Sequence, residues 1–294
     1  MASPTRALMN NLKPFLASTT HRTDIILSHT SRLLSTTSGV NSLLTTLFFT
    51  LTFLHAQLTR LLSARYESLA LSIASRASET LLPGETLIAT IQPPHLTLAS
   101  WCAAVKAAGD TVEDGWILMR LFGLFGVYSG ARKVYVEGKR DPVIKSLVWA
   151  KILARAGFQV LENGAFLVRR GVLRGEKWTA RERGLWVWSG RLWLADTVLE
   201  LLRLARVRQL KYNEDFGAEE VDEDEKDKKD FSIQSRALEK RWWRSLYINL
   251  GWLPPTFHLS FYDEERSPVS EGWVGFSGMV PGLIALQDAW RETA

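Results

Sequence analysis

The stretch GFSGMVPG at 275–282 spaces its glycines by three and then four positions, and GLFGVYSG at 123–130 repeats that spacing. On a helix that turns about 100° per residue, three such positions fall within an arc of roughly 60° and leave a groove without side chains. Another helix can approach closely along such a groove, as happens in lipid. Each glycine inside a helix costs roughly 0.5–1 kcal/mol relative to alanine, so the repeat favours a packing role over turns in loops, the other use that stays open. The predicted helix-contact glycines are Gly123, Gly126, Gly130, Gly275, Gly278 and Gly282.

Composition excludes several classes of protein. The chain has 294 residues, of which 46% are hydrophobic, so it can bury a core and is not disordered throughout. Its one cysteine, Cys102, excludes an internal disulfide framework and a Cys-x-x-Cys metal site, and it fits a reducing compartment. The sequence has no nucleophile elbow, P-loop, dinucleotide-binding glycine triplet or His-Glu-x-x-His motif. We therefore predict that the protein is not an enzyme, and we expect no cofactor and no metal site.

Tryptophan and basic charge point to a membrane surface. The chain holds twelve tryptophans, and residues 132–211 contain eighteen Lys or Arg against seven acids. Indoles favour boundaries between dry and wet surroundings, and anionic lipid accounts for basic and aromatic residues together. No nucleic-acid-binding motif accompanies them, so nucleic acid is not an expected partner. The predicted lipid-facing basic residues are Arg203, Arg206, Arg208 and Lys211, although a solvated helix face remains the alternative for each of them.

An amphipathic helix is predicted over residues 43–62, and His55 is the only titratable residue between Arg32 and Arg60. The apolar side chains fall within about 140° and the remaining arc is rich in threonine, so binding would depend on insertion into loosely packed lipid. Phe49 and Phe53 interrupt the polar face, which also fits a core helix of a bundle. The predicted membrane-inserting residues are Leu43, Leu44, Leu47, Phe48, Leu51, Leu54, Leu58 and Leu61.

The C-terminal segment 273–290 is the best candidate in the sequence for a membrane span. Its eighteen residues would extend roughly 27 Å as a helix, against a hydrocarbon core of about 30 Å. It has no charge before Asp288, a tryptophan at each end and Pro281 as a predicted kink. A hairpin that enters one leaflet fits the same residues.

The chain divides into four regions. Residues 1–23 form a basic extension rich in Ser and Thr, without acids, as in mitochondrial transit peptides. Residues 24–211 form a helical membrane-associated region, and 212–232 form an acidic loop, predicted to be disordered, with ten acids between Glu214 and Asp230. Residues 233–294 hold the C-terminal helices. The predicted fold is an all-α, membrane-associated bundle of amphipathic and hydrophobic helices that ends in a glycine-rich membrane segment.

Local sequence signals predict one helix start, one interruption and one helix end. Asp141 and Pro142 predict a helix start, because aspartate caps a helix and proline suits its first turn. Gly171 and Gly175 predict an interruption, and the stretch 251–255, with glycine and two prolines, predicts a helix end.

Four stretches in this order resemble the peroxisomal biogenesis factor 11 family, in particular its fungal gamma-like branch. They are DIILSHTSRLL at 24–34, QVLENGAFL at 159–167 with GVL at 171–173, WSGRLWLAD at 188–196, and the segment from EGWVGFSG at 271–278 to Trp290. The acid-free N-terminal extension and the long acidic insert depart from the pattern of the family.

The resemblance implies a peroxisomal membrane protein that elongates the membrane before fission. The expected partners are peroxisomal membrane lipids, further copies of this chain, the peroxisomal import receptor and the fission machinery. Two alternatives remain: a multi-pass channel or transporter, and a mitochondrial membrane scaffold if residues 1–23 are a transit peptide.

Overall fold

The computed structural model describes residues 23–80, 88, 96–137, 141–217, 225–263 and 266–293, and all regular secondary structure in these ranges is helical. The predicted all-α class is therefore confirmed. Most of the basic N-terminal extension, residues 1–22, lies outside the described part. Residues 23–34 are helical, and the helices that follow are α2 (Thr37–Thr80), α3 (Leu96–Arg120), α4 (Gly123–Glu137), α5 (Pro142–Arg169), α6 (Glu176–Thr179), α7 (Glu182–Gly217), α8 (Glu225–His258) and α9 (Glu271–Glu292).

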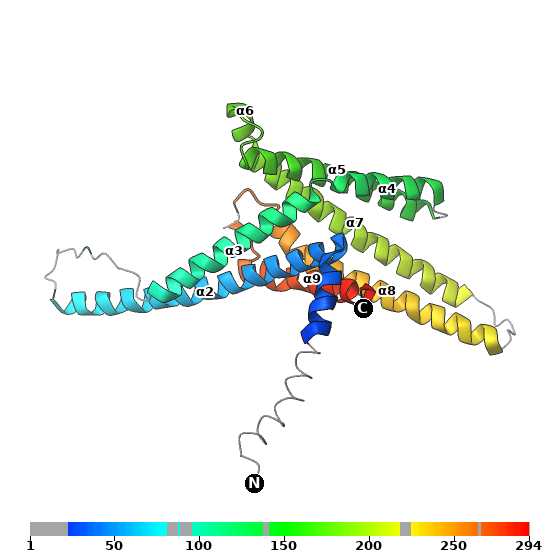
Figure 1. Cartoon of the computed structure of the whole chain (residues 1–294), viewed down its shortest axis with the longest axis horizontal. Coiled ribbons are helices and arrows are strands. Elements are labelled where there is room, and N and C mark those ends of the chain that lie inside the picture. The colour runs from blue at the N-terminus through cyan, green and yellow to red at the C-terminus, as the bar shows by residue number, and fades with distance from the viewer. Residues whose placement is uncertain are drawn as a thin grey trace, which may run out of the picture.

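Two closely packed helix pairs form the framework of the molecule. Helix α5 lies along α7, and α2 lies along α9 (Figure 1). Helix α3 packs on α2, while α8 contacts both α7 and α9 and so connects the two pairs. Helix α4 packs on α5, and helices α3 and α5 approach each other at few positions. The bundle is consequently open between α3 and α5.

Local sequence explains the start and end of α5. The Asp141 side chain accepts a hydrogen bond from the Ile144 amide at 2.8 Å, and proline occupies the first turn, so the predicted helix start is confirmed. After α5, Gly171 and Gly175 have φ angles of +68° and +115°. Residues with a Cβ rarely adopt such φ angles, which explains why the chain turns at these glycines.

The prediction that the stretch 251–255 ends a helix is wrong, because α8 continues to His258 with both prolines inside it. Each proline removes the hydrogen bond of its own amide and crowds the carbonyl of the preceding turn, so packing must compensate, and Pro255 and Thr256 are almost fully buried. Gly251 has another role, since a Cβ there would lie 2.7 Å from the Pro281 Cδ atom of α9.

The helices also extend into the predicted acidic loop from both sides. Helix α7 continues to Gly217 and α8 begins at Glu225, while residues 218–224 lie outside the described part. Glutamate and lysine are good helix formers, which favours a helix in such a charged run.

Aromatic rings fill the centre of the bundle. The Phe49 ring of α2 lies 6.1 Å from Trp116 of α3 and 5.4 Å from Trp252 of α8, between ring centroids. Trp193 of α7 completes the group, 5.1 Å from Trp252. Edge-on and tilted ring contacts of this kind stabilise the core beyond the area that they bury. Trp116, Trp193 and Trp252 therefore join α3, α7 and α8 at the centre of the bundle, whereas Trp101 is 66% exposed.

Candidate functional site

Three glycines of α9 form the contact with α2. A Cβ at Gly275 would collide with the backbone of Phe53, and one at Gly278 would collide with the Phe49 ring. At Gly282 a Cβ would lie 2.9 Å from the Thr46 Oγ1 atom. The glycines therefore allow the two helices to approach closely, in the manner of small-residue contacts between membrane helices.

The N-terminal part of the polar face of α2 is buried near this contact, whereas Thr50 and Thr59 further along the helix are exposed. Ser42, Thr45 and Thr46 are 1%, 4% and 9% exposed. The hydroxyl of Thr45 donates to the Asn41 carbonyl oxygen at 2.8 Å, and that of Thr46 donates to the Ser42 carbonyl oxygen at 2.8 Å. Because these hydroxyls find acceptors on their own helix, the polar face can be buried without a partner from another helix.

The predicted membrane-inserting residues divide into an outer and an inner group. Leu47, Leu54 and Leu61 recur every seven residues and are 40%, 43% and 58% exposed. The inner group is partly buried, with Phe48 near Trp116 and Leu51 beside Gly109 of α3. That inner group consists of Leu43, Leu44, Phe48, Leu51 and Leu58.

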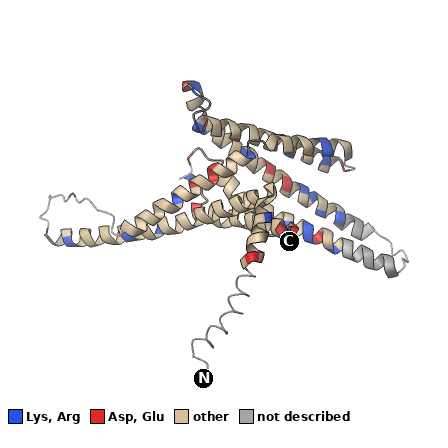
Figure 2. Ribbon diagram, in the orientation of Figure 1, with Lys and Arg blue, Asp and Glu red and all other residues tan. Residues whose placement is uncertain are grey.

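Helix α9 continues the apolar surface of α2. Trp273, Phe276 and Leu283 are 63%, 50% and 53% exposed. The Phe276 ring lies 6.2 Å from Phe53 and 5.8 Å from Trp273, so aromatic side chains bridge the two helices. Charged residues are sparse along both helices, whereas they gather on α7 and α8 (Figure 2).

Hydropathy selects α2 over α9 as the candidate membrane span. In the described part of the chain, only residues Thr37–Ala77 are long and apolar enough to cross a bilayer, and the fold buries 28% of their apolar window. The predicted segment 273–290 does not reach that hydropathy, because glycine, tryptophan, proline and glutamine occupy many of its positions.

The glycines of α4 have different surroundings from those of α9. A Cβ at Gly123 would lie 2.5 Å from the Gln159 Oε1 atom of α5, whereas Gly126 and Gly130 have no described atom near their Cβ positions. The same spacing therefore marks a filled contact on α9 and an open face on α4.

An exposed apolar face on α4 was missed in the sequence. Phe125, Tyr128, Tyr135 and Val136 are 71%, 69%, 80% and 75% exposed, together with Phe122 just before the helix at 70%. Their helical spacing was the available signal, since they fall within an arc of roughly 140°.

Side chains of α5 hold the break between α3 and α4. Helix α3 ends at Arg120, and the carbonyl oxygens released there need donors. The Gln159 amide donates to the Arg120 carbonyl oxygen at 2.8 Å, and the Asn163 amide donates to that of Leu121 at 2.9 Å. The QVLEN stretch thus supplies hydrogen bonds where the helix is interrupted.

Arg120 itself is neutralised within the bundle. Its guanidinium donates to the Glu162 carboxylate at 2.7 Å and lies 3.9 Å from the centroid of the Trp116 ring. Burial lowers the pKa of Arg120 and raises the pKa of Glu162, although each partner opposes the shift of the other. This pairing explains how a charged residue is accommodated among aromatic side chains.

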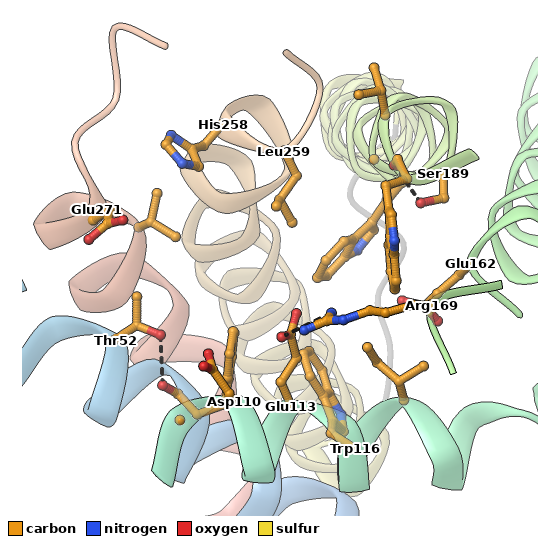
Figure 3. Close-up of a pocket in the computed structure, with 18 of the residues that line it drawn as sticks. Thr52, Asp110, Glu113, Trp116, Glu162, Arg169, Ser189, His258, Leu259 and Glu271 are labelled. Atoms are coloured by element: carbon orange, nitrogen blue, oxygen red, sulfur yellow. Dashed lines mark hydrogen bonds and ion pairs between the residues drawn. The ribbon is translucent and has the colours of Figure 1, made fainter. Parts of the chain in front are cut away.

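A cleft of about 840 Å³ beside this ion pair is lined by α2, α3, α5 and α7, and also by the end of α8 and the start of α9. Arg169 reaches from α5 towards Glu113 of α3, with 3.6 Å between nitrogen and oxygen (Figure 3). Burial raises the pKa of Glu113, and Arg169 partly offsets that effect. Next along each helix, Arg170 pairs with Asp114. These charges bridge two helices that pack little against each other, so we interpret the cleft as a structural seam.

The predicted lipid-facing basic residues mostly have acidic partners within the chain. Arg203 pairs with Glu200 at 2.6 Å, and Arg206 pairs with Asp141 at 2.9 Å. Arg208 lies 3.5 Å from Glu239 and also 5.3 Å from the centroid of the Trp242 ring, while Lys211 is partly exposed. Their charge is therefore less available to lipid than the sequence suggested.

Comparison with known proteins decides the family. The family model for peroxisomal biogenesis factor 11 (PEX11) matches residues 101–290, which span α3 to α9. The chain belongs to the PEX11 family. No curated protein and no solved structure matches it.

Membership in the PEX11 family supports a role as a peroxisomal membrane protein in peroxisome proliferation. The family comprises biogenesis factors that are generally not enzymes. The match includes the Arg120–Glu162 pair and the glycines of both α4 and α9, whereas α2 precedes the matched range. The fungal gamma-like branch stays a prediction.

Proposed function

We propose that this protein shapes and elongates the peroxisomal membrane by inserting apolar helix faces into it and by associating with further copies of itself. The observation that carries the proposal is the orientation of α2. Thr46 lies against Gly282 of α9 and Thr45 is buried beside it, while Leu47, Leu54 and Leu61 face outward. A water-soluble bundle buries its leucines and exposes its hydroxyls, so the opposite arrangement is typical of a helix that contacts lipid.

Insertion of such a face into one leaflet bends the bilayer. Apolar side chains that enter one leaflet expand its area relative to the other, and each fully buried leucine contributes up to about 1.5–3 kcal/mol to binding. The aromatic face of α4 offers a second surface of the same kind. Self-association would concentrate these faces, and the open side of α4 around Gly126 and Gly130 is the proposed contact between copies.

Tubulation of vesicles by the purified full-length chain tests the mechanism. We expect Leu47→Asp with Leu54→Asp to abolish tubulation, because two carboxylates would have to enter the hydrocarbon region. Val172→Asp with Ala180→Asp adds the same charges to exposed positions between α5 and α7 and serves as the control. Unchanged tubulation by the first variant, with loss in Phe125→Asp, would transfer the inserting role to α4.

Imaging tests the cellular role. A C-terminally tagged copy should surround peroxisomes and make them longer or more numerous at raised expression. A mitochondrial signal with normal peroxisomes would contradict the proposal. The import receptor and the fission machinery stay predicted partners.

A further inference from the structure

One face of α8 carries a graded row of exposed side chains. Arg236, Lys240, Trp243, Tyr247 and Leu250 are spaced by three or four residues, so they fall within an arc of roughly 80°. Trp243, Tyr247 and Leu250 are 41%, 53% and 46% exposed, and both cations are exposed as well. The row runs about 21 Å along the helix, from basic through aromatic to aliphatic. We call these five residues the α8 row.

Contacts on the other sides of α8 keep this row pointing outward. Trp242 donates its indole N–H to the Leu204 carbonyl oxygen of α7 at 2.9 Å. Arg244 pairs with Asp288 of α9, and its guanidinium donates to the Ile284 carbonyl oxygen at 3.0 Å. Helix α8 is therefore fixed to α7 and α9 through residues outside the α8 row.

The cations of the α8 row differ from those of α7. Arg203 and Arg206 face Glu200 and Asp141, whereas no ion pair within the described part of the chain engages Arg236 or Lys240. Both side chains are exposed, so their positive charge faces solvent.

We infer that the α8 row binds the surface of a bilayer that contains anionic phospholipid. Charge complementarity pairs Arg236 and Lys240 with anionic headgroups, and tryptophan and tyrosine favour the boundary between headgroups and acyl chains. The order of residues matches the depth of a bilayer, because Leu250 lies at the apolar end of the row and the cations lie at the polar end. An acidic protein surface would satisfy the cations but would not explain the graded aromatic and aliphatic part. This inference rests on the proposed membrane function and assigns a surface that selects anionic lipid.

Flotation of the full-length protein with vesicles tests the inference. The probe is phosphatidylcholine vesicles with and without phosphatidylserine. We expect Arg236→Gln with Lys240→Gln to reduce the preference for anionic vesicles roughly 25-fold, since each cation near the surface contributes about five-fold. Binding to neutral vesicles should stay unchanged, and added salt should weaken the preference of the unmodified protein.

The control removes the same charge elsewhere. Lys177 and Arg181 are exposed near α6, so Lys177→Gln with Arg181→Gln should keep the anionic preference. An undiminished preference in Arg236→Gln with Lys240→Gln would overturn the inference and leave the proposed function intact. Failure of the unmodified protein to float with either vesicle would overturn both. Loss of salt-sensitive self-association in that variant, without a change in lipid preference, would assign the row to a protein partner instead.

A depth measurement gives an independent test. In a Cys102→Ser background, an environment-sensitive fluorophore attached through Lys240→Cys or Leu250→Cys reports the surroundings of each end. Emission should shift to the blue on anionic vesicles at position 250 and much less at position 240. Equal emission at both ends would contradict the graded insertion.

Discussion

The Arg120 guanidinium donates to the Glu162 carboxylate at 2.7 Å and thereby joins α3 to α5 where α3 ends. The side chains are 19% and 5% exposed, so both charges depend on each other for compensation. Removal of one partner leaves the other buried without a counter-charge.

Single and double substitutions should separate pairing from packing at this site. We expect Glu162→Leu or Arg120→Leu to destabilise the protein by about 3–5 kcal/mol, and the combined variant to recover much of that loss. Thermal unfolding of the detergent-solubilised protein measures the effect. Additive losses in the double variant would show that the two charges act independently.

Hydrogen exchange should report how α5 holds α4. Gln159→Leu or Asn163→Leu would leave the Arg120 or Leu121 carbonyl oxygen without its donor, at a cost of about 1–3 kcal/mol. We expect faster amide exchange across α4, because this helix packs mainly on α5. Gln287→Leu makes the same substitution at an exposed position of α9 and should leave exchange in α4 unchanged.

The raised pKa of Glu113 should make the folded protein less stable as pH rises. Burial raises the pKa of Glu113 above its ordinary value of 4.5, so the folded state binds this proton more tightly than the unfolded state. The stabilisation from this group is complete below pH 4.5 and is lost as pH rises through the raised pKa. Glu113→Gln should therefore flatten the decline of the unfolding midpoint above pH 4.5.

Glu200 should behave in the opposite way. Burial opposes the shift, but hydrogen bonds from Arg203 and Lys151 hold the pKa of Glu200 below 4.5. Its contribution is present above pH 4.5 and is lost as pH falls through the lowered pKa, so Glu200→Gln should alter the acid side of the profile. The same change in slope from both variants would contradict the assignment.

Glycine substitutions should distinguish the two glycine repeats. Gly275→Ala would force α2 and α9 apart and should destabilise the protein by about 1–3 kcal/mol, because its Cβ meets backbone rather than a flexible side chain. Gly130→Ala meets open space and should be neutral or stabilising by up to about 1 kcal/mol. Unfolding midpoints of the two variants make the comparison. Equal losses would show that the α9 contact is not specific.

Substitution of the α4 glycines also tests the proposed contact between copies of the chain. Gly126→Leu with Gly130→Leu should weaken the crosslinked ladder if copies meet along α4, without a change in the unfolding midpoint of the monomer. An unaltered ladder would count against α4 as the contact.

The sequence by itself determined the helical class, the start of α5 at Asp141 and the turn at Gly171. These features depend on periodicity, capping and backbone freedom, which act over a few residues. It also provided the ordered motifs that resemble the family to which the chain belongs. The helix end predicted at 251–255 was wrong, because glycine and proline do not end a helix that tertiary contacts support.

Tertiary structure alone decided which face of each helix is covered. The glycines at 123–130 and 275–282 have the same spacing, yet only those of α9 receive a neighbouring helix along their whole length. Thr45 and Thr46 of α2 are buried and some of its leucines are exposed, and Arg206 pairs with an aspartate 65 residues away. Spacing in the sequence fixes which residues share a face, but the neighbour of that face depends on contacts between distant segments.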